Sequence, residues 1–147
     1  TVWGDRMEEL KFYQGKENFA PSYRVRKAVF GVEQGFEHDF DEEDDTAEHL
    51  VVYKDGEPVA TARCMPSGKP DGYYIGRVAV VRDERQNGYG RKMIRAIEQR
   101  LAGKGAKRIE LYAELYARPF YEKLGYAVAG EVFLDEGCPH VLMAKEV

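Results

Sequence analysis

The sequence predicts a single domain over residues 1–147 of the α+β class, in which a mixed sheet is flanked by helices. Its 147 residues suffice for one ordinary hydrophobic core. Hydrophobic residues make up 44% and charged residues 33% of the chain, which is typical of globular proteins. In some segments the apolar residues recur at every second position, and in others they recur every three to four positions. Strands and helices are therefore expected to alternate along the chain.

The first half predicts a strand, a helix and a hairpin. We expect a strand at Glu9–Tyr13 and an amphipathic helix from Pro21 to Gln34, since proline is favoured in a first helical turn. The residues on the apolar face of that helix are Tyr23, Ala28, Val29, Phe30 and Val32. Two strands then follow, His49–Tyr53 and Pro58–Cys64, joined through an Asp-Gly hairpin signal.

The second half predicts a β-α-β crossover and two closing strands. A strand at Tyr73–Val81 precedes a helix that starts at Gly88 and ends at Gly103. The apolar residues on one face of this helix are Tyr89, Met93, Ile94, Ile97 and Leu101. The remaining expected elements are a strand at Lys107–Ala113, a short helix at Pro119–Leu124, and strands at Tyr126–Phe133 and His140–Val147.

The charges are segregated along the chain, although the net charge is only -4. Between Glu33 and Glu48 there are nine acidic residues and no lysine or arginine. Between Arg85 and Arg108 eight basic residues accompany the single acid Glu98. Each run alone is compatible with a solvated surface, and together they favour a chain that handles an anion with one part and a cation with another.

Several classes of protein are disfavoured by composition. Apolar stretches are too short for a transmembrane helix or a signal-peptide core, so we expect a cytoplasmic protein without a membrane partner. Cys64 and Cys138 form no metal-binding pattern and have no evident histidine partner as nucleophiles. The acidic run lacks the glycine and glutamate of an EF-hand, and we predict no required metal. Residues 1–6 precede Met7 and are compatible with an alternative start.

The clearest chemistry lies between Arg85 and Lys92, in the sequence RQNGYGRK at the start of the central helix. Glycines allow a tight backbone turn, and the first helical amides with nearby cations form a phosphate site. A P-loop would need Lys-Ser/Thr after Gly90, and a dinucleotide fingerprint would need a small residue at Met93. Both familiar phosphate loops are therefore disfavoured.

The chain resembles the GNAT superfamily of acetyl-CoA-dependent N-acetyltransferases. Arg85-x-x-Gly88-x-Gly90 is similar to the pyrophosphate loop of that family, and the segment from Ala117 to Tyr126 is similar to its Ala-x-x-Phe-Tyr-x-x-x-Gly-Phe/Tyr segment. The segment VFGVEQG, residues 29–35, resembles a bacterial subgroup. The resemblance implies a central, mostly antiparallel sheet with a splayed cofactor cleft between the strands Tyr73–Val81 and Lys107–Ala113.

The resemblance also implies how acetyl-CoA, the cosubstrate, would be held. Backbone groups of the strand would pair with the pantetheine arm, and the loop amides would hold the pyrophosphate. The residues assigned to this binding are Val78, Ala79, Val80, Arg85, Gln86, Asn87, Gly88, Tyr89, Gly90 and Arg91. A strand amide near Val80 would stabilise the oxyanion that develops during direct attack by the amine.

The catalytic roles are likewise implied by the resemblance. Tyr121 stands at the general-acid tyrosine of the family, and a phenol of pKa ~10 is protonated at neutral pH while lying near a thiol of ~8.5. His140 resembles a histidine that acts as a base in some members. Glu114 replaces the usual Asn or Gln and is expected to position a cationic acceptor or point to water. Glu33, Glu114, His140 and an ordered water stay open as the general base.

The expected reaction is acetyl transfer from acetyl-CoA to a primary amine of a small molecule or peptide, in a ternary complex. Glu33, Asp39 and Asp41 would draw a protonated amine toward the acceptor side. A noncatalytic acetyl-CoA-binding sensor is the alternative, and Tyr121 favours the enzyme. The net negative charge argues against a nucleic-acid partner, and a homodimer is compatible with the sequence.

Overall fold

The computed structural model describes residues 2–3, 7–37 and 39–147, and the chain divides into two compact units. The first unit comprises residues 1–65 and 77–97, and the second comprises residues 66–76 and 98–147. The chain crosses between them three times, after residues 65, 76 and 97. Positions 1 and 4–6 of the segment before Met7 lie outside the described residues. That residues 1–147 act as one domain stays a prediction.

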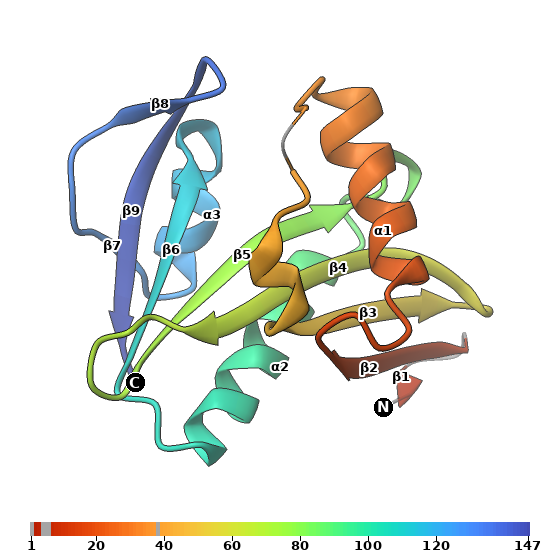
Figure 1. Ribbon diagram of the computed structural model, residues 1–147, viewed down its shortest axis with the longest axis horizontal. Helices are drawn as coiled ribbons and strands as arrows, with labels where there is room; N and C mark the ends of the chain where they lie inside the picture. Colours follow the sequence, from red (N-terminus) through yellow and green to blue (C-terminus); the bar gives the residue numbers. More distant parts are fainter. Residues whose placement is uncertain (1, 4–6, 38) are drawn as a thin grey trace. The chain divides into compact units, whose positions relative to one another are not determined.

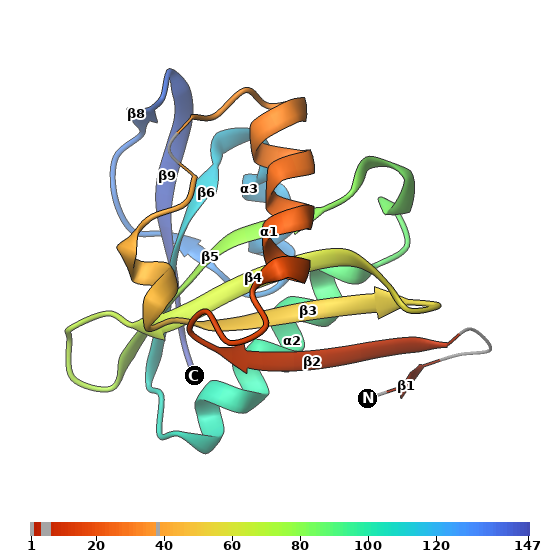
Figure 2. The ribbon, with the colours of Figure 1, turned by 45° about the vertical axis from the view of Figure 1, so that its right-hand side comes forward.

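The first unit is built on antiparallel strands, shown in Figures 1 and 2. Its elements are β1 (Val2–Trp3), β2 (Glu8–Gln14), α1 (Ala20–Arg26), η1 (Lys27–Glu33), η2 (Glu42–Asp45), β3 (Glu48–Lys54), β4 (Glu57–Pro66), the end of β5 (Gly72–Val80), η3 (Arg82–Glu84) and the start of α2 (Tyr89–Gly103). Strands β1 to β4 pair in chain order. The predicted hairpin is confirmed, because Asp55 and Gly56 both have positive φ, of 52° and 84°, as its tight turn requires. In both views α1 lies in front of β3 and β4.

The predicted helix from Pro21 to Gln34 changes its geometry halfway. It is α-helical over α1 and π-helical over η1, so that Gln34 N–H donates to the carbonyl of Val29. The buried apolar residues are Val25, Val29 and Phe30. Tyr23 and Val32 were expected on the apolar face, but they are 43% and 78% exposed. The widened turn shifts the register of the side chains, which a 3.6-residue period does not anticipate.

The second unit contains the crossover and the closing strands. Its elements are the start of β5, the end of α2, β6 (Arg108–Glu114), η4 (Leu115–Ala117), α3 (Arg118–Lys123), β7 (Ala127–Val128), β8 (Phe133–Asp135) and β9 (Cys138–Glu146). Gly72–Ile75 pair in parallel with Arg108–Leu111, as a β-α-β crossover demands. Strand β6 then pairs antiparallel with β9 over seven residues. In Figure 1, α3 lies behind β6.

The single strand predicted at Tyr126–Phe133 is wrong. The structure has two short strands there, β7 and β8, which both pair with β9. Val128 lies opposite Met143, and Phe133 lies opposite His140. The chain therefore advances five residues from β7 to β8 while β9 advances three. The two extra residues force the chain out of the ladder between the strands, as in a bulge. A sequence pattern of period two does not reveal where a partner strand changes register.

The predicted central helix and fold class are confirmed. All five residues assigned to the apolar face of α2 are buried: Tyr89, Met93, Ile94, Ile97 and Leu101. The sheet is mixed, since β5 and β6 run parallel, and mostly antiparallel elsewhere. The splayed cofactor cleft stays a prediction. Among the described residues no helix combines the length and the apolar character needed to cross a bilayer.

Candidate functional site

The loop between β5 and α2 has the geometry of an anion-binding turn. Gln86 and Gly88 both have positive φ, of 69° and 80°, so the backbone reverses twice before the helix. A Cβ built on Gly88 meets nothing within 4 Å, which leaves that side of the loop open. α2 is 15 residues long, and its first amides have no acceptor one turn earlier in the helix. The arrangement presents donors and a helix dipole to an anion.

Arg85 is held in place by two groups of the first unit. Its Nε donates to the carbonyl of Val80 at 3.0 Å, and its two terminal nitrogens each reach a carboxylate oxygen of Glu33 at 2.6 Å. The hydrogen bonds from Arg85 lower the pKa of Glu33. Glu33 was expected to bind the acceptor amine, and in the structure its carboxylate pairs with Arg85 of the β5–α2 loop. That Glu33 contacts the amine stays a prediction.

An open pocket of about 430 Å³ lies beside this ion pair. Its lining comes from the helical segment and from the residues that follow β5: Ala28, Val29, Val32, Glu33, Val81 and Arg82. Apolar side chains form one part of the wall, and the charges of Glu33 and Arg82 form another. The pocket thus offers an apolar surface next to the loop that carries the anion-binding geometry.

The other residues predicted to bind acetyl-CoA differ in how far their side chains are buried. Val78 and Val80 lie half-buried on β5, and Ala79 between them is buried. Tyr89 is only 2% exposed, so its side chain belongs to the core. The Asn87 side chain donates to Glu84 at 3.0 Å and stabilises the turn. Gly90 is half-buried, and Arg91 is exposed at the first turn of α2.

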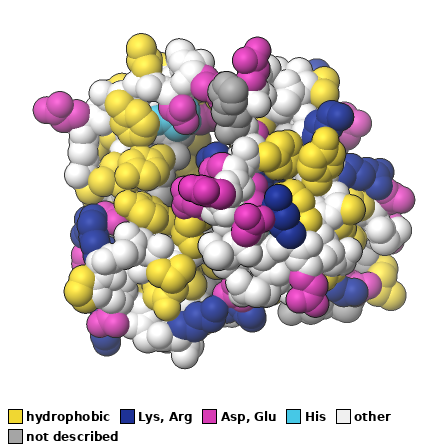
Figure 3. All heavy atoms as spheres, viewed as in Figure 1, with side chains coloured by type: hydrophobic (Ala, Val, Ile, Leu, Met, Phe, Trp, Pro, Cys, Tyr) yellow, Lys and Arg dark blue, Asp and Glu magenta, His cyan; other side chains and the backbone are white. Residues whose placement is uncertain are grey.

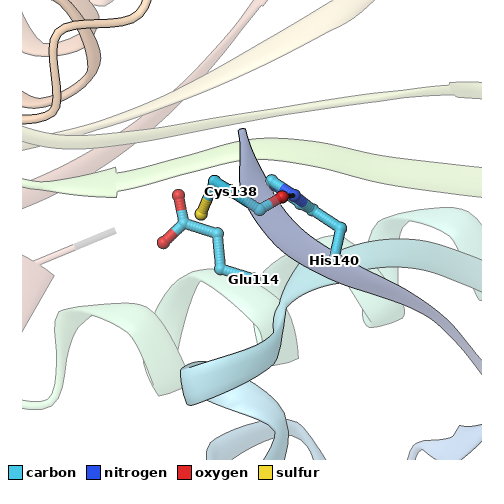
Figure 4. Close-up of side chains that lie close together, drawn as sticks. All are labelled: Glu114, Cys138 and His140. Carbon is cyan, nitrogen blue, oxygen red and sulfur yellow. Dashed lines mark hydrogen bonds between the residues drawn. The ribbon is translucent and has the colours of Figure 1, made fainter. Parts of the chain in front are cut away.

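In the second unit, strand pairing brings Glu114 and His140 together. Glu114 ends β6 directly opposite His140 on β9, and Cys138 lies two residues earlier on β9. Residues two apart on a strand share a face, so all three side chains point the same way. Their ligand-capable atoms lie within 4.8 Å of one another (Figure 4). Glu114 precedes Cys138 and His140 by more than twenty positions, and only the pairing of β6 with β9 brings it beside them.

The ring of His140 has a defined orientation. Its Nδ1 lies 2.8 Å from the carbonyl of Cys138, and a carbonyl only accepts, so Nδ1 carries the proton. The lone pair of the neutral ring is therefore on Nε2, where it is available to accept a proton. The ring stacks on Phe133 at 5.8 Å and is 8% exposed. Figure 3 shows hydrophobic side chains gathered on one face of the molecule, with acidic and basic side chains between and around them.

Tyr121 lies in α3 and is 7% exposed. Its ring packs edge-on against Phe120 and Tyr126, with centroid distances of 5.0 and 6.1 Å. Burial and then the charge of Glu114 raise the pKa of Tyr121. The phenol therefore stays protonated over the whole working range of pH, as a proton donor must. It is a weaker acid than an ordinary tyrosine, so the close match to a thiol pKa assumed from the sequence does not hold in the free protein.

The acidic run, residues 33–48, is not simply a solvated loop, because several of its carboxylates pair with arginines. Arg26, 1% exposed, donates to Asp39 at 2.9 Å and to Asp44 at 2.7 Å. Arg63 reaches Asp44 at 2.8 Å and Asp41 at 2.7 Å. Asp39 and Asp41, expected to attract a cationic acceptor, are thus paired with arginines inside the first unit. That they attract the acceptor amine stays a prediction.

A third arginine completes this network. The pKa values of the aspartates depend on the balance between pairing with arginine and burial. Arg77 lies 2.9 Å from Asp39 and 3.2 Å from Asp41. Burial raises the pKa of Asp44, but the bonds from Arg26 and Arg63 outweigh it and lower the pKa to about 2. Burial dominates at Asp39, whose pKa is raised despite Arg26. The sequence signal for this network is that Arg26 and Arg63 stand in mainly apolar segments, outside the acidic run.

The comparisons with known proteins agree with this geometry. Residues 12–126 match the Acetyltransferase (GNAT) family. A Bacillus subtilis protein named as the uncharacterized N-acetyltransferase YjcF is 36% identical over 137 residues, covering 90% of this chain and 96% of its own. The crystal structure of Escherichia coli ElaA is 29% identical and superposes with a TM-score of 0.86, covering 95% of this chain and 100% of ElaA.

A solved structure from Lactobacillus plantarum is 33% identical, with a TM-score of 0.87 over 95% of this chain and 97% of that one. These similarities extend over the β5–α2 loop and over the segment that carries Tyr121. They confirm the fold and the resemblance to acetyl-CoA-dependent acetyltransferases. The subgroup suggested by residues 29–35 stays a prediction. The chain belongs to the GNAT acetyltransferase family.

Proposed function

We propose that this protein transfers an acetyl group from acetyl-CoA to a primary amine, with the amine attacking directly in a ternary complex. The observation that carries the proposal is the pairing of Glu114 with His140 at the end of β6, in the unit that also holds Tyr121. A cation-binding carboxylate, a base with a free lone pair and a protonated phenol are the groups that this reaction needs. The family assignment supplies the general chemistry.

The residues of the first unit fit acetyl-CoA. The open side of Gly88 leaves room for a phosphate, and the α2 amides with Arg85 would neutralise it. The apolar wall of the 430 Å³ pocket suits the pantetheine arm, and β5 would bind that arm as an added strand through Val78 and Val80. Two neighbours with the same fold, each 17% identical, are named as complexes with coenzyme A: N-acetylglutamate synthase of Neisseria gonorrhoeae and an aminoglycoside 6'-N-acetyltransferase.

Acetyl-CoA supplies the activated acetyl thioester, and side chains of the protein accept and donate the protons. Glu114 attracts the protonated amine, because a half-buried carboxylate is a favourable partner of an ammonium group. His140 Nε2 takes the proton that the amine must lose before it can attack. The amide near Val80 donates to the carbonyl oxygen as negative charge develops there. Tyr121 then gives its proton to the departing thiolate, and the buried phenolate formed for a moment is restored from solvent.

The test is thiol release from acetyl-CoA across a panel of primary amines, with each product confirmed by mass. The proposal expects at least one amine to be acetylated with a turnover that depends on Tyr121 and His140. The panel contains cationic, neutral and anionic amines and peptides with free N-termini. Binding of coenzyme A without acetylation of any amine would instead support the noncatalytic sensor.

A further inference from the structure

Three side chains at the end of the second-unit sheet form a constellation that the acetyl-transfer mechanism does not fully use. Glu114 and His140 have assigned roles, whereas Cys138 has none. Cys138 is the first residue of β9, two positions before His140, so its thiol lies on the same face of the strand as the His140 ring. Figure 4 shows the sulfur directed toward the carboxylate of Glu114. The ligand-capable atoms of the three lie within 4.8 Å of one another.

The donor set has a chemical preference. A thiolate, an imidazole nitrogen and a carboxylate are the three ligand types that Zn²⁺ accepts in proteins, with bonds of about 2.0–2.3 Å. Such a tetrahedral ion holds its ligand atoms about 3.5 Å apart. An ion bound here would therefore draw the three ligand atoms closer together than their present limit of 4.8 Å. Harder ions such as Mg²⁺ and Ca²⁺ avoid sulfur.

The fixed tautomer of His140 supports this arrangement. Nδ1 donates to the carbonyl of Cys138 at 2.8 Å, which leaves Nε2 as the nitrogen able to coordinate. A ligating histidine usually holds its other ring N–H on a carbonyl or carboxylate in this manner. The ring is further oriented by its stacking on Phe133. The imidazole is thus positioned before any ion arrives.

We propose that Glu114, Cys138 and His140 bind Zn²⁺ and that the ion inhibits acetyl transfer. On binding, the thiol of Cys138 releases its proton to solvent and the sulfur forms a bond to the ion. Water or the acceptor amine takes the fourth position. The ion coordinates the lone pair of His140 and neutralises the charge of Glu114, so neither residue can act on the amine. The inhibition therefore rests on the proposed function, whereas the metal binding does not.

Metal binding is tested without activity by adding Co²⁺ to the purified protein. A thiolate-to-cobalt absorption band in the near ultraviolet is expected in the wild type, and Zn²⁺ should remove it by competition in the micromolar range. Cys138→Ser should abolish the band and weaken zinc binding by more than about tenfold. Asp135→Asn is the matched control, because it removes a charge beside Cys138 without removing a ligand. Absence of the band in the wild type, or equal zinc binding by Cys138→Ser, overturns the proposal.

Inhibition is tested separately with the amine that gives the fastest turnover. Wild-type activity should fall as free Zn²⁺ rises and return when a chelator is added. Cys138→Ser should keep its basal turnover, because the serine leaves Glu114 and His140 in place, and should need more than about tenfold more zinc for the same inhibition. Equal zinc sensitivity of the two proteins rejects the regulatory role. A protein that binds cobalt through Cys138 and acetylates no amine would retain the metal site and reject the proposed function.

Discussion

Arg85 binds Glu33 through two parallel hydrogen bonds, each 2.6 Å long, and so joins the phosphate loop to the end of the π-helical segment. A two-point pair of this kind fixes the orientation of the guanidinium group. It also places a negative charge beside the site proposed for a pyrophosphate. The pair therefore both orients Arg85 and opposes the anion that Arg85 would bind.

Replacing Glu33 with Gln is expected to tighten coenzyme A binding. The amide keeps a hydrogen-bond acceptor near Arg85 and removes the repelling charge, so we expect Kd to fall by about two- to fivefold at low salt and by less at high salt. Isothermal titration at two ionic strengths measures this. Glu57→Gln is the control, because Glu57 pairs with Arg24 at 2.8 Å elsewhere in the same unit. Weaker binding by Glu33→Gln would mean that orienting Arg85 outweighs the repulsion.

Gly88→Asp should remove coenzyme A binding from a folded protein. The added side chain would occupy the open side of the loop and bring negative charge to the phosphate position, so we expect Kd to rise by at least about tenfold. Part of any loss of stability would come from the positive φ of 80° at this residue. Gly56→Asp provides the comparison, since Gly56 has a φ of 84° and open surroundings in the β3–β4 turn. Unchanged binding in folded Gly88→Asp would contradict the loop assignment.

Tyr121→Phe should lower kcat by about a hundredfold and leave the KM for acetyl-CoA nearly unchanged, as expected when a general acid is lost. The ring and its packing against Phe120 and Tyr126 are kept. Steady-state kinetics with the best amine measure the change. Tyr126→Phe is the matched variant: it loses a hydrogen bond to Glu98 of 2.8 Å and should lose stability without a comparable loss of kcat. Equal turnover in Tyr121→Phe and the wild type would remove Tyr121 from the mechanism.

Acid should destabilise the first unit through Asp44. Its pKa is lowered to about 2 in the folded protein, so its stabilising contribution is complete above the unfolded value of 3.8 and is lost as the pH falls toward 2. A shift of this size corresponds to about 2 kcal/mol. Urea unfolding at pH values from 5 to about 2 would measure the loss.

Asp44→Asn should be less stable near neutral pH and should lack this part of the acid dependence. Asp39→Asn is the informative comparison, because the pKa of Asp39 is raised and its contribution falls as the pH rises through that raised value. Asp39→Asn should therefore keep the loss between pH 4 and about 2. The same slope in Asp44→Asn and in the wild type would show that the arginine pairs of Asp44 do not supply the acid sensitivity.

The elements with a strong local cause were predictable from the sequence. The Asp55-Gly56 turn requires positive φ at both positions, and few residues other than Asp, Asn and Gly adopt it readily. The face of α2 from Tyr89 to Leu101 repeats every three or four residues, and that period alone determines which side chains are buried. The conformation of the β5–α2 loop is equally local, because its glycines and the following helix are adjacent in the chain. Its role in phosphate binding stays a prediction.

The features that depend on a partner far along the chain were decided only by the tertiary structure. From the sequence, the acidic run was compatible with a solvated loop, and only the fold brings Arg26 and Arg63 against Asp44. The pairing of Glu33 with Arg85 likewise appears only in the folded chain. The break between β7 and β8 follows from a change of register on β9. The sequence by itself determined the local turns, the helix faces and the family motifs. The ion pairs were determined by the packing of helices and loops, and the grouping of Glu114, Cys138 and His140 was determined by strand pairing. Neighbours of both kinds leave no periodic signal in a single chain.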